Sequence, residues 1–264
     1  MEPMITVMCL IGIKLLSTPN GETRLIVAAN RDERHDRATA PANWWPEHPG
    51  LFAGKDLVAG GTWLGATASG RFAAVTNVRS PSTIGAQASP LSRGDLPLKF
   101  LTENPRAKDY CKKIIDQGQN FGGFNFLAWD TQELWWCSNQ GQPAHQLNPG
   151  IYAVSNGALN TPWPKSQAIA TTLETVHGEA HLLAALRNVE IPPGQLPDTG
   201  IGVELERHLA PAFILNNEYG TRCSTVLTLG SEDSQFTEVS YGLDGGEIQR
   251  VSVSLNARES ERRR

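Results

Sequence analysis

The stretch VMCLIGIKLL, residues 7–16, is an apolar run, and the polar segment STPNGE (17–22) separates it from a second apolar run, RLIVAAN (24–30). Two apolar segments joined through turn-forming residues are typical of a β-hairpin. The chain is therefore expected to begin its folded part with two antiparallel strands.

Outward from this hairpin, runs of β-branched and aromatic residues between turn signals predict further strands. They cover residues 62–66, 71–77, 124–129, 133–137, 224–229, 236–241 and 248–254. Apolar residues three or four positions apart predict helices over 95–101, 105–117, 165–176 and 181–187. Mainly antiparallel strands with helices between them indicate an α+β fold built of layers.

The chain is predicted to form one domain without an internal linker. The Pro- and Gly-containing segment 191–202 is interpreted as a long surface loop rather than a linker, so a single domain is predicted over residues 1–264. The three arginines at 262–264 follow Glu259 and Glu261, and the end of the chain, 256–264, is interpreted as a frayed, solvated tail.

Composition narrows the possible functions. A formal net charge of -4 with 19% charged residues gives no electrostatic argument for binding nucleic acid or an anionic membrane. The first apolar run is interrupted by Lys14 and is too short to span a bilayer.

The four cysteines are widely spaced and form no CxxC pair, which predicts a reducing, cytoplasmic location. The histidines show no HExxH pattern, and there is no dinucleotide fingerprint, so neither a metal nor a cofactor is predicted.

Met8-Cys9 is the first feature with chemical content. Removing the methionine would give Cys9 a free α-amino group beside its own thiol. An α-amine has a reference pKa of roughly 7.7–8.0, so it can act as the base that activates the nucleophile. This use of Cys9 requires residues 1–8 to be removed or not translated. The alternative is a buried cysteine in a strand, which is a common structural role.

The register of the hairpin predicts the partner of this cysteine. If Asn20-Gly21 forms a two-residue turn, Cys9 lies opposite Asp32. Directly opposed residues share a face, with Cβ atoms about 4.5–5.5 Å apart, so the carboxylate could orient the N-terminal ammonium. Pro19 could favour a longer turn, which would shift the register by one residue and move Asp32 to the other face.

Residues 30–33 read NRDE, the four letters after which the NRDE family is named, and the chain resembles that family from residue 8 to about 229. The resemblance extends over an ordered series of motifs: MC (8–9), GGTWLG (60–65), AVTN (74–77), SRG (92–94), GFN (123–125), SNG (155–157) and TPWPK (161–165). That family includes the eukaryotic transport and Golgi organisation protein.

The NRDE family in turn resembles the cysteine N-terminal-nucleophile hydrolases of the penicillin V acylase and bile salt hydrolase type. This resemblance implies a four-layer αββα sandwich of two mainly antiparallel sheets. It also implies cleavage of a non-peptide amide bond through an acyl-enzyme on Cys9, with Asp32 as the carboxylate beside the nucleophile.

Three further site residues are implied by the same resemblance. Asn156 matches the asparagine near the nucleophile, Asn77 lies where the side-chain donor of the oxyanion hole is expected, and Arg222 lies near the place of a late arginine. The alternatives are turn-forming asparagines at strand ends and a surface arginine at the start of a strand. The sequence departs from the acylase pattern at Ala29, where those enzymes carry an arginine three positions before the aspartate. Arg31 is expected to point to the opposite face from Asp32.

Two hypotheses about function remain open. The first is a cysteine amidohydrolase acting on a small acylated amide, with catalytic residues Cys9, Asp32, Asn77, Asn156 and Arg222. The second is a non-catalytic carrier or trafficking factor for an apolar ligand such as haem or an acyl thioester, a role that the eukaryotic family members suggest.

Overall fold

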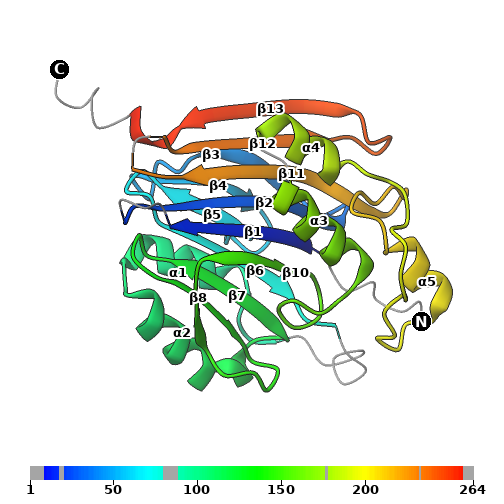
Figure 1. Ribbon diagram of the computed structural model, residues 1–264, viewed down its shortest axis with the longest axis horizontal. Helices are drawn as coiled ribbons and strands as arrows, with labels where there is room; N and C mark the ends of the chain where they lie inside the picture. Colours follow the sequence, from blue (N-terminus) through cyan, green and yellow to red (C-terminus); the bar gives the residue numbers. More distant parts are fainter. Residues whose placement is uncertain (1–8, 18–20, 80–88, 176–177, 232, 258–264) are drawn as a thin grey trace.

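The computed structural model describes residues 9–17, 21–79, 89–175, 178–231 and 233–257 (Figure 1). Residues 1–8, whose removal is predicted, and most of the predicted tail lie outside this description. Where the described chain ends, Leu255–Ala257 forms a 3₁₀ turn, and the side chain of Leu255 is buried.

The strands form two sheets, and every strand pair in them is antiparallel. The six-stranded sheet has the order β10 (Gly150–Val154), β1 (Cys9–Ser17), β2 (Thr23–Arg34), β11 (Tyr219–Leu229), β12 (Gln235–Tyr241) and β13 (Glu247–Ser254). The seven-stranded sheet has the order β3 (Thr39–Trp44), β4 (Leu51–Asp56), β5 (Leu64–Thr67), β6 (Phe72–Asn77), β7 (Phe124–Trp129), β8 (Leu134–Ser138) and β9 (His145–Leu147). The helices are α1 (Asp95–Glu103), α2 (Ala107–Asp116), α3 (Pro164–Thr175), α4 (Glu179–Leu186) and α5 (Val203–His208).

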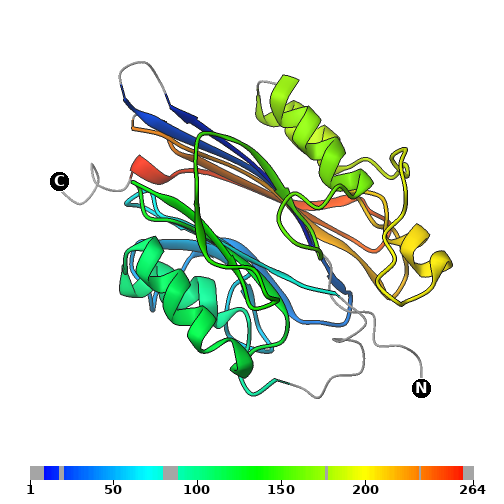
Figure 2. The same cartoon turned by 60° about the horizontal axis from the view of Figure 1, so that its bottom comes forward.

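The two sheets lie face to face between two layers of helices, as Figure 2 shows. One buried cluster fills the space between the sheets, including Ile13 from β1 and Phe72 from β6. A second cluster joins α1 and α2 to the outer face of the seven-stranded sheet. A third joins α3 and α4 to the outer face of the six-stranded sheet. The predicted α+β fold, a four-layer αββα sandwich of antiparallel sheets, is therefore confirmed.

Residue alternation along β1 follows from this layering. Ile11, Ile13 and Leu15 belong to the core between the sheets, whereas Leu10 packs under the helices. A strand covered on both faces needs apolar residues on both, which explains the continuous apolar run at the start of the chain.

The predicted register of the first hairpin is wrong by one residue. Cys9 pairs with Arg31, and Ser17 pairs with Thr23, so five residues connect the strands instead of a two-residue turn. An odd number of connecting residues shifts the pairing by one position and therefore exchanges the faces of the second strand. Asp32 lies on the helix-covered face, where it is paired with Thr221 of β11.

Most of the other predicted elements are found, and the loop predicted over 191–202 contains no helix or strand. The elements that were not predicted are β3, β4, β9, β10 and α5, and β11 begins at Tyr219, before the predicted residue 224. In β3 the cause is local: the pairing with β4 is irregular between Ala40 and Asn43, where Pro41 interrupts the strand pattern.

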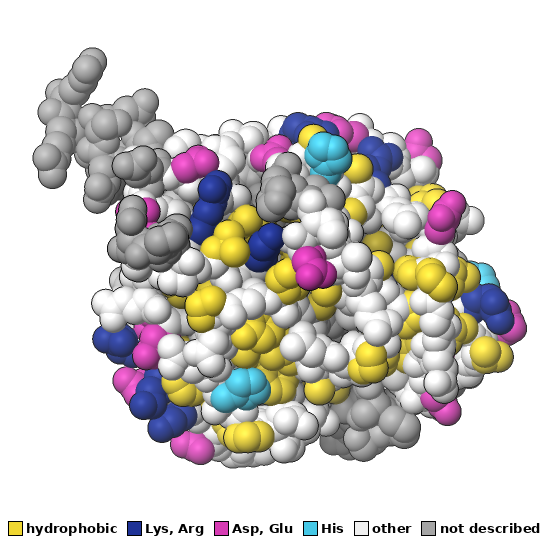
Figure 3. All heavy atoms as spheres, viewed as in Figure 1, with side chains coloured by type: hydrophobic (Ala, Val, Ile, Leu, Met, Phe, Trp, Pro, Cys, Tyr) yellow, Lys and Arg dark blue, Asp and Glu magenta, His cyan; other side chains and the backbone are white. Residues whose placement is uncertain are grey.

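Two surface properties complete the description. Among the described residues, none of the helices has the length and apolar character needed to cross a membrane. On the face drawn in Figure 3, acidic and basic side chains are interspersed rather than gathered into a patch of one sign.

We expect the contact between Phe52 of β4 and Phe236 of β12 to hold the two sheets together. Both side chains are buried, and their rings meet edge to face with centroids 5.0 Å apart. Phe52→Ala should lower the free energy of unfolding by about 3–5 kcal/mol, because it leaves a cavity between the sheets. Leu57→Ala, at an exposed position, should change it by less than about 0.5 kcal/mol. Equal effects of the two variants in urea unfolding would contradict this packing.

Candidate functional site

Cys9 is the first residue of β1 and is almost completely buried. Its carbonyl oxygen accepts a hydrogen bond of 2.8 Å from the Ser155 hydroxyl. Burial and then the charge of Asp32 raise the pKa of the Cys9 thiol to about 12, while a hydrogen bond from the Asp32 backbone N–H and the charge of Arg31 act in the opposite direction. In the chain as it continues before Cys9, the thiol is therefore protonated at neutral pH.

Asp32 is fully buried beside this cysteine. Its Oδ1 accepts a hydrogen bond of 2.7 Å from the Thr221 hydroxyl, but among the described residues its Oδ2 has no hydrogen-bond partner. Burial raises the pKa of Asp32 to about 6, an effect that the charge of Lys165 opposes. A buried carboxylate oxygen without a donor costs free energy, so this atom marks a place where a further donor would be stabilising.

Lys165 is a buried cation that we did not predict as a site residue. It lies in the first turn of α3, and its Nζ donates to the Leu209 carbonyl at 3.0 Å. Burial lowers the pKa of Lys165 to about 8, with the charge of Asp32 as the main opposing influence. The only signal in the sequence was its position at the end of the TPWPK motif, which does not reveal that it meets Asp32.

A buried ion pair adjoins this group. Arg79 Nη2 lies 2.6 Å from Glu206 Oε2, and both side chains are inaccessible to solvent. Glu206 Oε1 also accepts hydrogen bonds from the backbone N–H and the hydroxyl of Thr199. The site therefore contains two buried cations, Lys165 and Arg79, and two buried carboxylates on the helix side of the six-stranded sheet.

The two predicted asparagines are brought together and joined to the cysteine. Asn156 Nδ2 donates to the Asn77 carbonyl oxygen at 2.8 Å, and the Arg79 N–H donates to the Asn156 carbonyl oxygen. The Ser155 hydroxyl that bonds Cys9 also lies 3.2 Å from Asn156 Oδ1. These bonds fix the end of β6 and the end of β10 next to the start of β1.

Arg222, in contrast, lies in β11, and its side chain extends to the end of β2 and the segment after it. Its Nη1 donates to the carbonyl oxygens of Arg34, His35 and Arg37, at 2.8, 3.2 and 3.3 Å. The pairing of β11 with β2 is irregular at this residue, and such an irregularity redirects the side chain away from the regular ladder. These hydrogen bonds from Arg222 therefore stabilise the segment that follows β2.

Two other arginines lie nearer the cysteine. Arg31, on the opposite face from Asp32 as expected, is directly opposite Cys9 and lies on the face between the sheets. Arg93 precedes α1, and burial lowers the pKa of its guanidinium, an effect that the neighbouring Cys9 and Glu33 oppose. Both belong to motifs noted in the sequence, but neither was assigned to the site. The predicted register put Asp32 in the place of Arg31.

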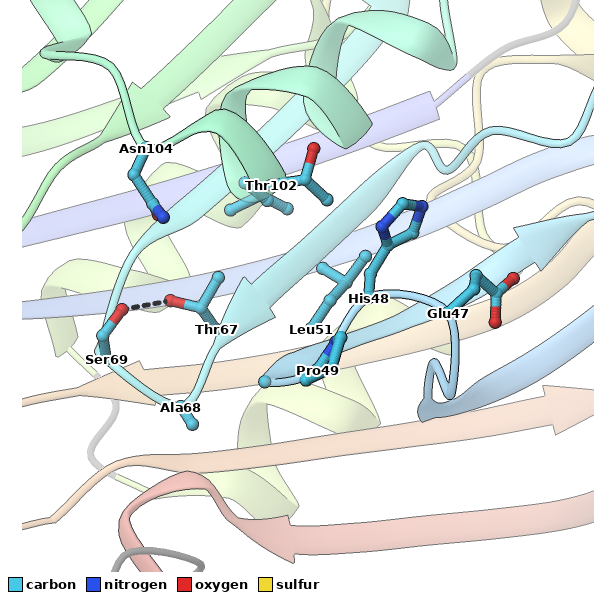
Figure 4. Close-up of a pocket in the computed structure, with 11 residues that line it drawn as sticks. Glu47, His48, Pro49, Leu51, Thr67, Ala68, Ser69, Thr102 and Asn104 are labelled. Atoms are coloured by element: carbon cyan, nitrogen blue, oxygen red, sulfur yellow. Dashed lines mark hydrogen bonds between the residues drawn. The ribbon is translucent and has the colours of Figure 1, made fainter.

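A cavity of about 350 Å³ lies elsewhere in the molecule (Figure 4). It is lined by residues 47–51, 67–69, 101, 102 and 104, so it opens where β4 begins and β5 ends. Asn77 is at the opposite end of the antiparallel pair β5–β6, so this cavity and the predicted site residues lie at different ends of the seven-stranded sheet. None of the predicted site residues lines it.

The fold and the site define the chain as an αββα sandwich protein whose polar centre surrounds a buried cysteine at the start of a central strand. The chain belongs to the Transport and Golgi organisation 2 family, which matches residues 8–242. It is 32% identical over 262 residues to the Transport and Golgi organization 2 homolog of Mus musculus, covering 88% of this chain and 92% of that one. The corresponding protein of Homo sapiens is 32% identical over 260 residues, with the same coverage. Transport and Golgi organization protein 2 of Drosophila melanogaster is 27% identical over 273 residues, covering 90% and 94% of the two chains.

Among solved structures, a cysteine-to-alanine mutant of conjugated bile acid hydrolase from Clostridium perfringens aligns with 92% of this chain and 96% of its own. The TM-score is 0.39 and the sequence identity 9%. Because both values are low, this alignment carries no conclusion about activity.

We expect Asp32→Asn to make the Cys9 thiol more reactive, because the carboxylate charge raises the pKa of the thiol. Each unit by which this pKa falls should speed alkylation by iodoacetamide about threefold at a pH below the pKa, since the thiolate fraction rises while its intrinsic nucleophilicity decreases. The rate at Cys9 is measured by peptide mass spectrometry. Asp36→Asn, which removes an exposed carboxylate paired with Arg34, is the control and should leave the rate unchanged. A slower or equal rate in Asp32→Asn would contradict the electrostatic coupling.

Proposed function

We propose that this protein is a cysteine N-terminal-nucleophile amidohydrolase, which cleaves a non-peptide C–N amide bond of a small acylated substrate. The observation that carries the proposal is the buried Asp32 carboxylate, whose Oδ2 has no hydrogen-bond partner among the described residues, next to a cysteine with a thiol pKa of about 12.

As they stand, Cys9 lacks a base that can deprotonate its thiol, and Asp32 Oδ2 lacks a hydrogen-bond donor among the described residues. A thiol protonated at neutral pH is a poor nucleophile, and the nearby negative charge keeps it protonated. Removal of residues 1–8 would place an α-amine on Cys9 itself, with a reference pKa of roughly 7.7–8.0. As an ammonium, this group would supply both the hydrogen-bond donor that Asp32 Oδ2 lacks and the positive charge that stabilises a thiolate.

The reaction follows from the same groups. The Cys9 thiol transfers its proton to the α-amine, and its Sγ attacks the carbonyl carbon of the amide. The C–N bond breaks as the ammonium returns the proton to the leaving amine, which leaves a thioester on Cys9. Water, deprotonated by the α-amine, then hydrolyses this thioester to the carboxylic acid and the free thiol.

The asparagines are proposed to stabilise the transition state. The Asn77 side chain is the proposed oxyanion donor, and Asn156 orients it by binding the Asn77 carbonyl oxygen. Lys165 holds a positive charge on the far side of Asp32 and favours the ionised carboxylate. Arg222 is left out of the catalytic set, because its guanidinium bonds the carbonyls of residues 34, 35 and 37.

The decisive measurement is the intact mass of protein purified from its native source, combined with turnover of coumarin amides that carry acyl groups of increasing length. We expect a chain that starts at Cys9, and we expect Cys9→Ala to abolish turnover. Loss of the oxyanion donor in Asn77→Ala should reduce kcat about 100- to 1000-fold. Cys223→Ala is the matched control, because Cys223 is also buried and is paired with the same Arg31, and it should keep its turnover.

Two outcomes would overturn the proposal. One is a mature chain that retains residues 1–8, because its Cys9 has no α-amine. The other is turnover that survives in Cys9→Ala. Transfer of haem or an acyl thioester by the Cys9→Ala protein at the wild-type rate would instead identify the chain as a carrier.

A further inference from the structure

We propose, building on the proposed hydrolase function, that Arg93 forms an anion-binding subsite beside Cys9, and that the acylated substrate carries a carboxylate or phosphate group close to its scissile amide. The inference starts from two sequence motifs that the catalytic residues leave unexplained, GGTWLG (60–65) and SRG (92–94).

These motifs meet backbone to backbone. A Cβ atom added to Gly61 would lie 2.5 Å from the carbonyl carbon of Gly94, so this approach requires glycine. The Thr62 N–H donates to the Gly94 carbonyl oxygen at 3.1 Å and closes the contact. The segment just before α1 is thereby held rigidly against the segment just before β5, and Arg93 is carried on it.

The Arg93 side chain then extends towards the end of β6. Its Nη1 donates to the Gly123 carbonyl oxygen at 3.2 Å, an atom that also accepts the Val78 N–H at 2.9 Å. Val78 directly follows Asn77, the proposed oxyanion donor. Gly122 provides the space, because a Cβ there would lie 2.9 Å from Arg93 Nη1.

Among the described residues, no carboxylate pairs with Arg93. The side chain of Arg93 is nevertheless partly buried. The neighbouring titratable groups that act on the pKa of Arg93 are Cys9, Glu33 and Arg37.

The carboxylates nearby are already shared with other arginines. Glu33 lies 3.7 Å from both Arg31 and Arg37, and Arg37 also pairs with Asp56 at 2.7 Å. The buried Glu238 also interacts with Arg31, so the carboxylates in this region act on arginines other than Arg93. A guanidinium offers a planar fork of donors that fits a carboxylate or a phosphate. An anionic substrate group would both satisfy these donors and orient the amide over the thiol.

Thermal unfolding of the full chain tests whether the subsite binds anions. We expect Tm to rise in acetate or in inorganic phosphate relative to chloride at equal ionic strength, because a ligand that binds only the folded state stabilises it. The anion whose rise is reduced more by Arg93→Gln distinguishes a carboxylate from a phosphate. Phosphate and acetate also stabilise folded proteins without binding, so the rise should be smaller in Arg93→Gln than in the wild-type protein and be kept in Arg93→Lys. It should also persist in Arg106→Gln, which removes an exposed arginine paired with Asp130. No difference between the anions and chloride, or an equal rise in Arg93→Gln, would overturn the proposal.

Alkylation locates the subsite relative to the thiol. The ratio of the iodoacetate rate to the iodoacetamide rate at Cys9 should exceed that of free cysteine about tenfold at low salt, since the two reagents differ mainly in charge. The ratio should fall to the free value in Arg93→Gln, and also in Gly122→Ala, which displaces the guanidinium without removing it. A ratio equal to that of free cysteine in the wild-type protein would refute the placement. Neither experiment depends on turnover or on the start of the chain, so failure of the hydrolase proposal and failure of this one are separate results.

Discussion

The pairing of β1 with β2 sets which charges surround Cys9, and the rest of the site depends on it. Because Cys9 is opposite Arg31, the cysteine and that arginine share the face between the sheets, while Asp32 is turned to the helix-covered face. The same register directs Ile11 and Ile13 into the central core. A slip of one residue would carry these apolar side chains out of the core, so the core that stabilises the sandwich also fixes the electrostatics of the site.

The buried charges are difficult to explain by stability alone. Asp32 and Lys165 are each almost inaccessible to solvent, and burial shifts the pKa of each towards its neutral form. Replacing such groups by apolar residues of similar volume is often neutral or stabilising. The structure keeps them, together with the Arg79–Glu206 pair, where the ends of β1, β6 and β10 converge. Strongly perturbed ionisable groups gathered around a potential nucleophile are typical of functional sites.

The sequence predicted interactions between residues close together in the chain better than interactions between residues far apart in it. Local patterns predicted β7 and β8 well, because a short turn joins two runs of strand-forming residues. The register of the first hairpin depended on the number of connecting residues, which the Asn20-Gly21 dipeptide does not determine. Asn77 and Asn156 were assigned from the family resemblance; the Asn156 side chain bonds the Asn77 backbone, and their catalytic roles stay a prediction. Lys165 and Arg93 were missed because each reaches the site only through packing between distant parts of the chain, which no local pattern encodes.

Because Cys9 is the first residue of β1, groups on the two faces of one sheet can act on it in different ways. An interior strand residue presents its side chain to one face and has both backbone groups engaged in the ladder. The first residue of a strand can also present its side chain to one face of the sheet. If the chain begins at that residue, its α-amine can bond a carboxylate on the opposite face. In the proposed mechanism, Asp32 and Lys165 therefore govern the protonation of the amine from the helix side, and Arg31 and Arg93 govern the charge of the ligand from the side between the sheets. The two sets of charges are not independent, because the charge of Arg31 also acts on the Cys9 thiol. In the proposed mechanism the Asp32 carboxylate therefore offsets the nearby cations and keeps the α-amine basic enough to accept the proton of the thiol.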